Sequence, residues 1–359
     1  AISVLPTNGF AFENVASILV ISSIAKNGGK FEDIVSSEAL DSAINAFLRE
    51  PVVPEAIATI ALSKQGDDRR QLMQDAFGLS RREPLVTGWL IADSGSQNDL
   101  SSVLRYYDTI LRTKVSSEPI IVPLIAKALV NDEFVEPLSI SLSKTPSWSG
   151  AFWRQIVVTP EAIENAVELR KRTFSLGETN VYKKRDAELI GALIRGGKFV
   201  AARELYDLLT ESKDRGKVLH NGDFLIKPDY PPMNWQLTSD GEFGATINDG
   251  KLFMSAAPNA GGLFARQLVQ LSKETLELRV HMDSSIPSNA EISINISCAE
   301  SIINKPEPVT IRIRETPFRQ KISNTNSECQ YFWFSIYGKS TENADGFDIA
   351  IDTIGLSPV

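Results

Sequence analysis

The sequence has little of the residues that nucleophilic and metal-dependent catalysis require. Its 359 residues contain two histidines, His220 and His281, and two cysteines, Cys298 and Cys329. It has no Gly-x-Ser-x-Gly turn, no glycine-rich phosphate loop followed by Lys-Ser/Thr, and no Cys or His pair at metal-ligand spacing. We therefore predict that the chain is not an enzyme and that it holds no cofactor and no metal.

Long apolar runs and basic excess are also missing. The most apolar early stretch, Val15 to Ala25, is too short to cross a bilayer, so we expect a core helix and no membrane span. No basic segment precedes it, and no signal peptide is visible. The net charge is −8. An acidic surface repels phosphate backbones, which argues against nucleic acid as a partner.

The length and a change of hydrophobic period predict two domains. Before residues 219–235 apolar residues recur at three and four positions, and after them they alternate at two. Asn221-Gly222 and three prolines interrupt the chain at this change. We expect a helical domain at residues 1–212, a linker at 213–220 and a β domain at 221–359. The β domain has 11 Lys and Arg against 17 Asp and Glu, a net charge of −6.

The helical part shows an internal repeat. Similar helix boundaries recur at intervals of 33 and 35 residues, at Arg49-Glu50-Pro51, Arg82-Glu83-Pro84 and Ser117-Glu118-Pro119. Polar turns fall between them, at Gln65 to Asp68, Gln97 to Asp99 and Asn131-Asp132. A period near 34 with two helices per unit is typical of an array of stacked helical hairpins.

The last unit, Asp186 to Leu209, resembles a tetratricopeptide repeat. The resemblance depends on small residues and a glycine turn at Gly191, Ala192, Gly196, Gly197, Ala201 and Ala202, followed by Leu205 and Tyr206. Ile110 to Ala128 is a weaker match, and the resemblance covers roughly residues 31–209. It implies a groove that binds a protein or peptide. The alternative is that these helices only support the β domain.

The β part alternates with period two. One face of each segment is apolar, at Leu276/Leu278/Val280/Met282, Ile292/Ile294/Ile296/Cys298, Val309/Ile311/Ile313 and Phe347/Ile349/Ile351. Short strands with one apolar face and Gly, Asn and Pro turns predict an antiparallel β-sandwich, which we expect to be a jelly roll.

The order of landmarks in the β part resembles jelly-roll carbohydrate-binding modules. Asn221-Gly222-Asp223-Phe224 opens the segment, and Ile351-Asp352-Thr353-Ile354 closes it. The resemblance implies polysaccharide binding. Many members hold a structural calcium ion with a glutamate and an aspartate pair. Here Leu225 and Thr353 replace two of those ligands, so calcium is not expected.

The combination of both parts resembles alphaproteobacterial envelope proteins, some of them associated with exopolysaccharide. It implies a periplasmic or cell-surface location. Two thiols in one β domain fit either a disulfide or two unrelated buried residues. Their shared domain and the resemblance favour a Cys298–Cys329 disulfide, which suits an oxidising compartment.

One aromatic strand supplies the candidate ligand site. In Gln330 to Tyr337, alternation places Phe332, Phe334 and Ile336 on one face. The opposite face carries Tyr331, Trp333 and Tyr337. That face would serve either as a platform for sugar rings or as an interface with the helices. Basic residues on other strands would join the platform if they share its sheet surface and would favour an acidic polysaccharide, namely Arg279, Arg312 and Arg314.

These inferences lead to three hypotheses about function. In the first, the chain is a non-catalytic envelope adaptor, with a protein partner in the helical groove and polysaccharide on the jelly roll. In the second, it is a structural subunit that makes only protein contacts. In the third, it is a glycan-active enzyme, which would require two carboxylates roughly 5–9 Å apart in a cleft.

Overall fold

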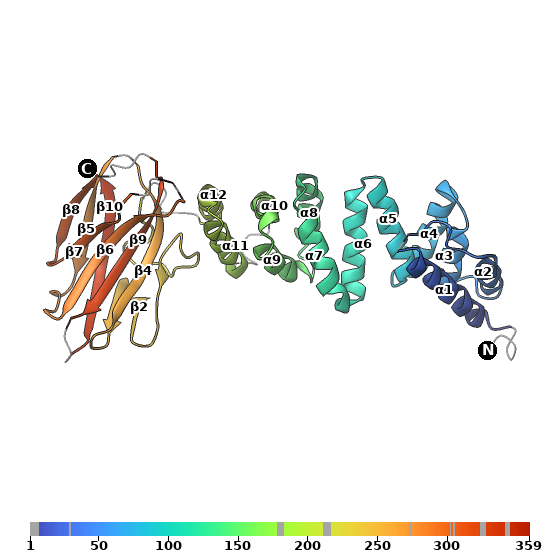
Figure 1. The fold of residues 1–359 in the computed structure, drawn as a ribbon, viewed down its shortest axis with the longest axis horizontal. Helices are drawn as coiled ribbons and strands as arrows, with labels where there is room; N and C mark the ends of the chain where they lie inside the picture. The colour runs from blue at the N-terminus through green and yellow to red at the C-terminus, as the bar shows by residue number, and fades with distance from the viewer. Residues whose placement is uncertain are drawn as a thin grey trace. The chain divides into compact units, whose positions relative to one another are not determined.

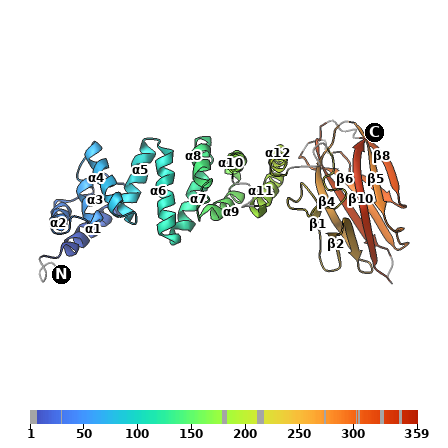
Figure 2. The same cartoon turned by 180° about the vertical axis from the view of Figure 1, so that it is seen from behind.

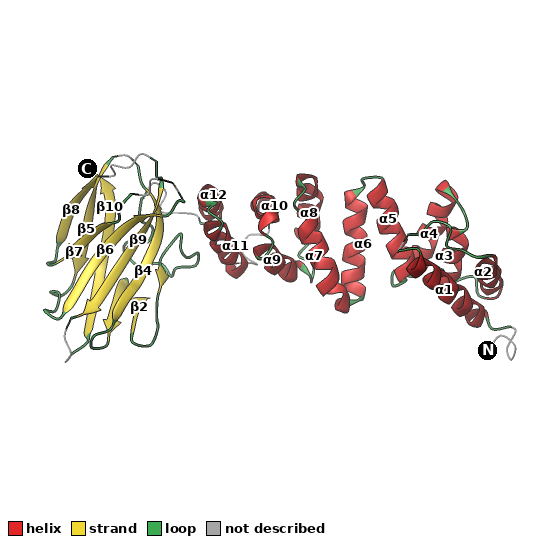
Figure 3. Ribbon diagram, viewed as in Figure 1, coloured by secondary structure: helices red, strands yellow, loops and turns green. Residues whose placement is uncertain are grey.

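The chain forms two compact units. The computed structural model describes residues 7–28, 30–177, 183–210, 217–272, 274–301, 303, 306–323, 328–341 and 345–359. Unit 1 comprises residues 1–178, and unit 2 comprises residues 179–359 (Figure 1). Within the described ranges, unit 1 is helical, whereas unit 2 holds two further helices and all the strands (Figure 3).

The helices of unit 1 pack on helices that are close to them in sequence. The α-helices are α1 Gly9–Lys26, α2 Ser37–Arg49, α3 Pro54–Leu62, α4 Gly66–Leu79, α5 Pro84–Ser96, α6 Leu100–Thr113, α7 Glu118–Ala128, α8 Val135–Leu142, α9 Ser149–Val157 and α10 Ile163–Ser175. α1 packs on α2, α3 on α4 and α5 on α6, whereas α7 packs on α9 and α8 on α10 (Figure 2). The predicted hairpin array is confirmed, whereas its tetratricopeptide type stays a prediction.

The repeated sequence boundaries have a local physical cause. Pro84 and Pro119 of the predicted boundaries occupy the first turns of α5 and α7, where a missing N–H costs no helical hydrogen bond. Pro51 of the first predicted boundary lies in the turn before α3, which begins at Pro54. Glu83 caps α5 by accepting the Leu85 N–H at 3.1 Å. Turns at 63–65, 97–99 and 129–131 end α3, α5 and α7. The turn predicted at Gln97 to Asp99 is found there, whereas residues 66–68 of the first predicted turn belong to α4 and Asp132 of the third begins a short 3-10 helix.

Helix α1 has one buried and one exposed side. Ala16 and Val20 are buried, whereas Phe10, Ile18 and Ile21 are each more than half exposed. By length and composition, α1 is the helix among the described residues that is long and apolar enough to cross a membrane. Its length exceeds the eleven apolar residues of the sequence prediction because helix formation extends back to Gly9.

Unit 2 contains the predicted sandwich. Its helices are α11 Lys183–Arg195 and α12 Phe199–Leu209, and its strands are β1 Gln236–Leu237, β2 Phe243–Asn248, β3 Lys251–Ala256, β4 Gly261–Gln270, β5 Thr275–Met282, β6 Ala290–Cys298, β7 Val309–Ile313, β8 Phe318–Ser323, β9 Tyr331–Ser340 and β10 Phe347–Pro358. The strands form two antiparallel five-stranded sheets. We call these sheet A, in the order β1-β4-β9-β6-β7, and sheet B, in the order β2-β3-β10-β5-β8.

Alternation of side chains builds the core between the sheets. The apolar sets of β5, β6 and β10 all face inward, and Phe332, Phe334 and Ile336 join them from β9. The alternate positions face outward. The fold prediction is therefore confirmed, and each sheet has one outer face.

The proline-rich stretch at 219–235 belongs to the sandwich. Leu219, Phe224 and Trp235 lie in its core. The Asn221 carbonyl accepts the Trp235 indole N–H at 2.9 Å. The Ile354 N–H donates to the Gly222 carbonyl at 2.8 Å, which ties this stretch to β10. A Cβ atom on Gly222 would lie 2.1 Å from the Ile354 carbonyl oxygen, so only glycine permits this close approach.

The last helical hairpin groups with the sandwich rather than with unit 1. Tyr206 of α12 contacts the His220 ring, with centroids 5.0 Å apart, and the Tyr230 ring at 6.1 Å.

Within the predicted linker at 213–220, residues 213–216 lie outside the described residues. The predicted boundary stays a prediction, although the change from helix to strand occurs between α12 and β1.

Replacing Gly222 by alanine should destabilise the sandwich by about 1–3 kcal/mol, because the new methyl group forces the β10 backbone away. Hydrogen exchange measured by mass spectrometry should show faster exchange in peptides of the sandwich. Gly355→Ala is the matched control, since a Cβ there meets nothing within 4 Å. Equal exchange in both variants would refute the steric account.

Two carboxyl groups meet between helices of unit 1. Burial, followed by a hydrogen bond with Glu55, raises the pKa of Glu83 to about 7. In the unfolded chain a glutamate ionises near pH 4.3. The folded state therefore binds an extra proton between these values. The stability that the protonated Glu83 contributes is therefore fully present below about pH 4.3 and is lost as pH rises through about 7.

Glu83→Gln should remove this loss, because glutamine keeps the helix cap without ionising. We expect the variant to be more stable than the parent at pH 8 by about 1–2 kcal/mol and equal to it near pH 4. This difference is smaller than the full pKa shift implies, because solvent screens the partly exposed group. Urea unfolding followed by circular dichroism at 222 nm measures this difference. Glu32→Gln, at an exposed loop carboxylate, is the control. A pH-independent difference would contradict the prediction.

Candidate functional site

The outer face of sheet A is built around its central strand, β9. Because β9 buries Phe332, Phe334 and Ile336, its other side chains must point away from the core. The predicted ring set occupies this outer face with unequal exposure. Tyr331 is 5% exposed, Trp333 is partly exposed and Tyr337 is 40% exposed.

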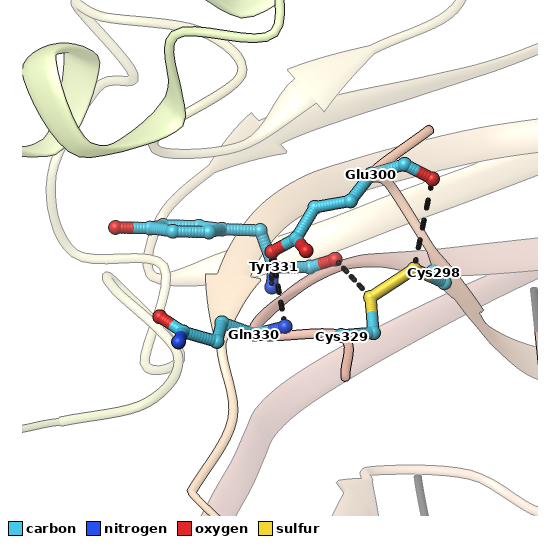
Figure 4. The surroundings of a disulfide bond; sticks show 5 residues. All are labelled: Cys298, Glu300, Cys329, Gln330 and Tyr331. Carbon is cyan, nitrogen blue, oxygen red and sulfur yellow. Dashed lines mark hydrogen bonds between the residues drawn. A yellow bond between two sulfur atoms is a disulfide. The ribbon is translucent and has the colours of Figure 1, made fainter. Parts of the chain in front are cut away.

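Tyr331 is covered by the last helix. Its ring stacks on Phe199 of α12, with centroids 5.3 Å apart and an interplanar angle of 26°. Burial raises the pKa of its phenol, which stays protonated at neutral pH. The Glu300 carboxylate accepts the N–H groups of Gln330 and Tyr331 at 3.0 and 2.9 Å, which fixes the start of β9 (Figure 4). At this position the interface alternative holds.

The Arg266 side chain lies over the ring of Trp333. The Arg266 guanidinium carbon lies 4.5 Å from the Trp333 centroid, within the range of a cation–π contact. Arg266 Nε donates to Gln236 Oε1 at 2.8 Å, which uses one of its five N–H donors. Neither Arg266 nor Gln236 was predicted from the sequence. Arg266 stands between Ala265 and Gln267, which are both buried in β4, and this alternation is the signal that could have placed its side chain on the outer face.

Hydrogen-bonding side chains continue across the face beyond β9. Tyr337 is opposite Ser293 on β6, and Ser293 is opposite Arg312 on β7. One row further along, the Asn295 amide donates to the Thr310 hydroxyl at 3.1 Å. Rings at the centre and polar groups on both sides therefore share one surface.

The structure separates the three predicted arginines. Arg312 lies in the same row as Tyr337, and Arg314 follows the end of β7 as an exposed residue. Arg279 lies on β5 of sheet B, where it pairs with Glu277. Arg279 therefore does not share the surface with the rings. The sequence could not show this, because alternation along a strand does not say which sheet the strand joins.

The predicted disulfide is confirmed. Cys298 and Cys329 are bonded, with Cα atoms 6.1 Å apart (Figure 4). The bond joins the end of β6 to the residues just before β9, its neighbour in sheet A. It closes the loop that contains β7 and β8 and holds the end of β9 that carries Tyr331. A disulfide is consistent with an extracellular or envelope location.

Titratable groups on sheet B form ion pairs. Lys251 pairs with Asp283 and also with Asp352, at 3.0 Å. His281 Nδ1 lies 3.0 Å from Asp352 Oδ2. Among the residues that the structure describes, no group of three or more His, Cys, Asp or Glu side chains is arranged to hold a metal ion. The mutual pairing of these charges is typical of a structural cluster.

Unit 1 contains a cleft of about 500 Å³. Aromatic residues and charges of both signs line it: Lys30, Phe31, Glu32, Arg69, Trp89, Ala92, Asp93 and Ser96. Arg69 donates to the carbonyl oxygens of Lys64 and Leu62, and Asp93 pairs with Arg70 at 2.8 Å. These internal contacts fix both side chains at the edge of the cleft.

Comparison with known proteins gives limited results. No protein-family model matches the chain, and no curated protein sequence matches it. Among solved structures, the chain is similar to TmCBM61 in complex with β-1,4-galactotriose, at 13% identity and a TM-score of 0.27, over 40% of this chain and 99% of that one.

Two further structures are similar over comparable lengths. A structure titled "CBM4 structure and function" has 16% identity and a TM-score of 0.28, over 39% of this chain and 99% of that one. A structure of accessory secretory protein 1, 2 and 3 in Streptococcus pneumoniae has 13% identity and a TM-score of 0.25, over 35% and 96%.

Proposed function

We propose that unit 2 binds an acidic polysaccharide on the outer face of sheet A. The observation that carries the proposal is the exposure of Trp333 and Tyr337 on one side of the central strand. Four strand positions separate them, which corresponds to about 13 Å. Two rings at this distance can contact different units of one saccharide chain, whose apolar ring faces stack on aromatic side chains.

The charges on this face favour an anionic ligand. Arg266 lies over Trp333, and Arg312 is in the row of Tyr337. An arginine guanidinium binds a carboxylate with two parallel hydrogen bonds. The net charge of −6 on residues 221–359 slows the approach of an anion, but local donors determine the contact.

The adaptor hypothesis extends this proposal to the whole chain. The helical unit would hold a protein partner, and the cleft lined by Trp89 and Phe31 is its candidate site. Together with the disulfide, polysaccharide binding would suit a non-catalytic protein in the periplasm or at the cell surface.

A structural role is the second candidate. It is favoured by the stack of Tyr331 on Phe199, which takes one ring of the predicted platform into an internal contact. In that case the outer face of sheet A would meet protein, and its two remaining rings would be interface anchors.

Trp333→Ala should weaken binding of the full chain to polygalacturonate or alginate at least tenfold, because it removes a stacking ring and the support of Arg266. Affinity electrophoresis in gels that contain each polymer measures the loss. Arg312→Gln should weaken binding several-fold, and less so at high salt, where ionic contacts contribute little.

Tyr331→Phe is the matched control. It alters a ring of the same strand face that is already covered by Phe199, so binding should not change. Thermal unfolding of each variant checks that the sandwich is intact. Unchanged mobility of folded Trp333→Ala, or no retardation of the parent by either polymer, would refute the proposal.

A further inference from the structure

An exposed aromatic ring stands on the opposite side of the sandwich. On β3, Leu252, Met254 and Ala256 enter the core, so Phe253 and Ser255 point outward from sheet B. Phe253 is 41% exposed. A single exposed apolar side chain is common in soluble proteins and indicates nothing by itself.

The neighbours of Phe253 leave its ring accessible. Directly opposite are Thr246 on β2 and Ala350 on β10. In the next row, Ser255 is opposite Gly244. The small residues Ala350 and Gly244 therefore occupy positions at which a larger side chain would cover the Phe253 ring. Gly244 is constrained in turn, because a Cβ there would lie 3.2 Å from the Ser239 hydroxyl.

A pocket of about 230 Å³ opens at this ring. The polar residues among those that line it are Ser239, Glu242, Thr246 and Ser255. The Glu242 backbone is fixed by the turn, since Asp240 Oδ1 accepts its N–H at 3.1 Å. Sites for drug-sized ligands are larger, at about 300–1,000 Å³, so a single sugar unit is a suitable occupant.

The charges around this pocket differ from those of sheet A. Asp348 lies opposite Ser255, and Glu242 lines the pocket itself. Lys251, the nearest base along β3, is paired with Asp283 and Asp352. Carboxylates and hydroxyls accept hydrogen bonds from sugar hydroxyls, and the two carboxylates repel a sugar carboxylate.

We propose that the outer face of sheet B holds a second saccharide site, centred on Phe253, that takes a neutral sugar unit. One ring face would stack on Phe253, while Thr246, Ser255 and Glu242 bond its hydroxyl groups. This site uses no residue of sheet A. It stands or fails independently of the acidic-polysaccharide site, and two such sites would allow one sandwich to join two different polymers.

The test compares the full chain with Phe253→Ala in gels that contain neutral polymers, namely dextran, galactomannan or mixed-linkage β-glucan. We expect at least one neutral polymer to retard the parent, and Phe253→Ala to weaken that binding at least tenfold. Thr246→Val, which removes one hydroxyl and keeps the shape, should weaken it several-fold. Val158→Ala removes an exposed apolar side chain of unit 1 and should have no effect.

The same variants in polygalacturonate gels separate the two sites. Phe253→Ala should bind polygalacturonate as the parent does, and Trp333→Ala should retain its binding to the neutral polymer. The inference is overturned if no neutral polymer retards the parent, or if folded Phe253→Ala binds it normally. It is also overturned if Trp333→Ala alone abolishes both kinds of binding, because the neutral polymer would then occupy sheet A.

Discussion

The two-residue alternation of β9 is the constraint from which the candidate site follows. Phe332, Phe334 and Ile336 are required in the core between the sheets, so the intervening side chains cannot avoid the outer face. β9 lies in the middle of sheet A, with β4 on one side and β6 on the other. On its outer face, Arg266 from β4 lies over Trp333, and Ser293 from β6 is opposite Tyr337.

The same alternation gives the sandwich two outer faces of different chemistry. Sheet A presents indole and phenol rings beside Arg266 and Arg312. On sheet B, Phe253 stands beside hydroxyls and carboxylates, and Lys251 on the same strand is already paired. Net charge alone does not describe such a domain, because the two proposed sites have different local charges.

The sequence predicted the elements and their buried faces because these depend on local periodicity. The hairpin array of unit 1 and the inward sets of β5, β6 and β10 follow from short stretches of sequence, whereas the disulfide was predicted from the shared β domain and the family resemblance. Contacts between distant elements were harder. The stack of Tyr331 on Phe199 requires knowledge of where α12 lies, and alternation alone left platform and interface equally open.

Assignment of strands to sheets was the other missing piece. Arg279 and Arg312 look alike in sequence, each on the polar side of a strand, yet they belong to different sheets. Arg266 follows Ala265 in a strand with a register shift between Leu263 and Ala265. This irregularity interrupts the two-residue alternation of β4 just before Arg266.

A crystal structure of the full chain with tetragalacturonate would test the central claim most directly. Our account predicts saccharide density over Trp333 and Tyr337, with a sugar carboxylate within hydrogen-bonding distance of Arg266 or Arg312. Density confined to the sheet B face or to the helical unit, or none at ligand concentrations in the millimolar range, would contradict it.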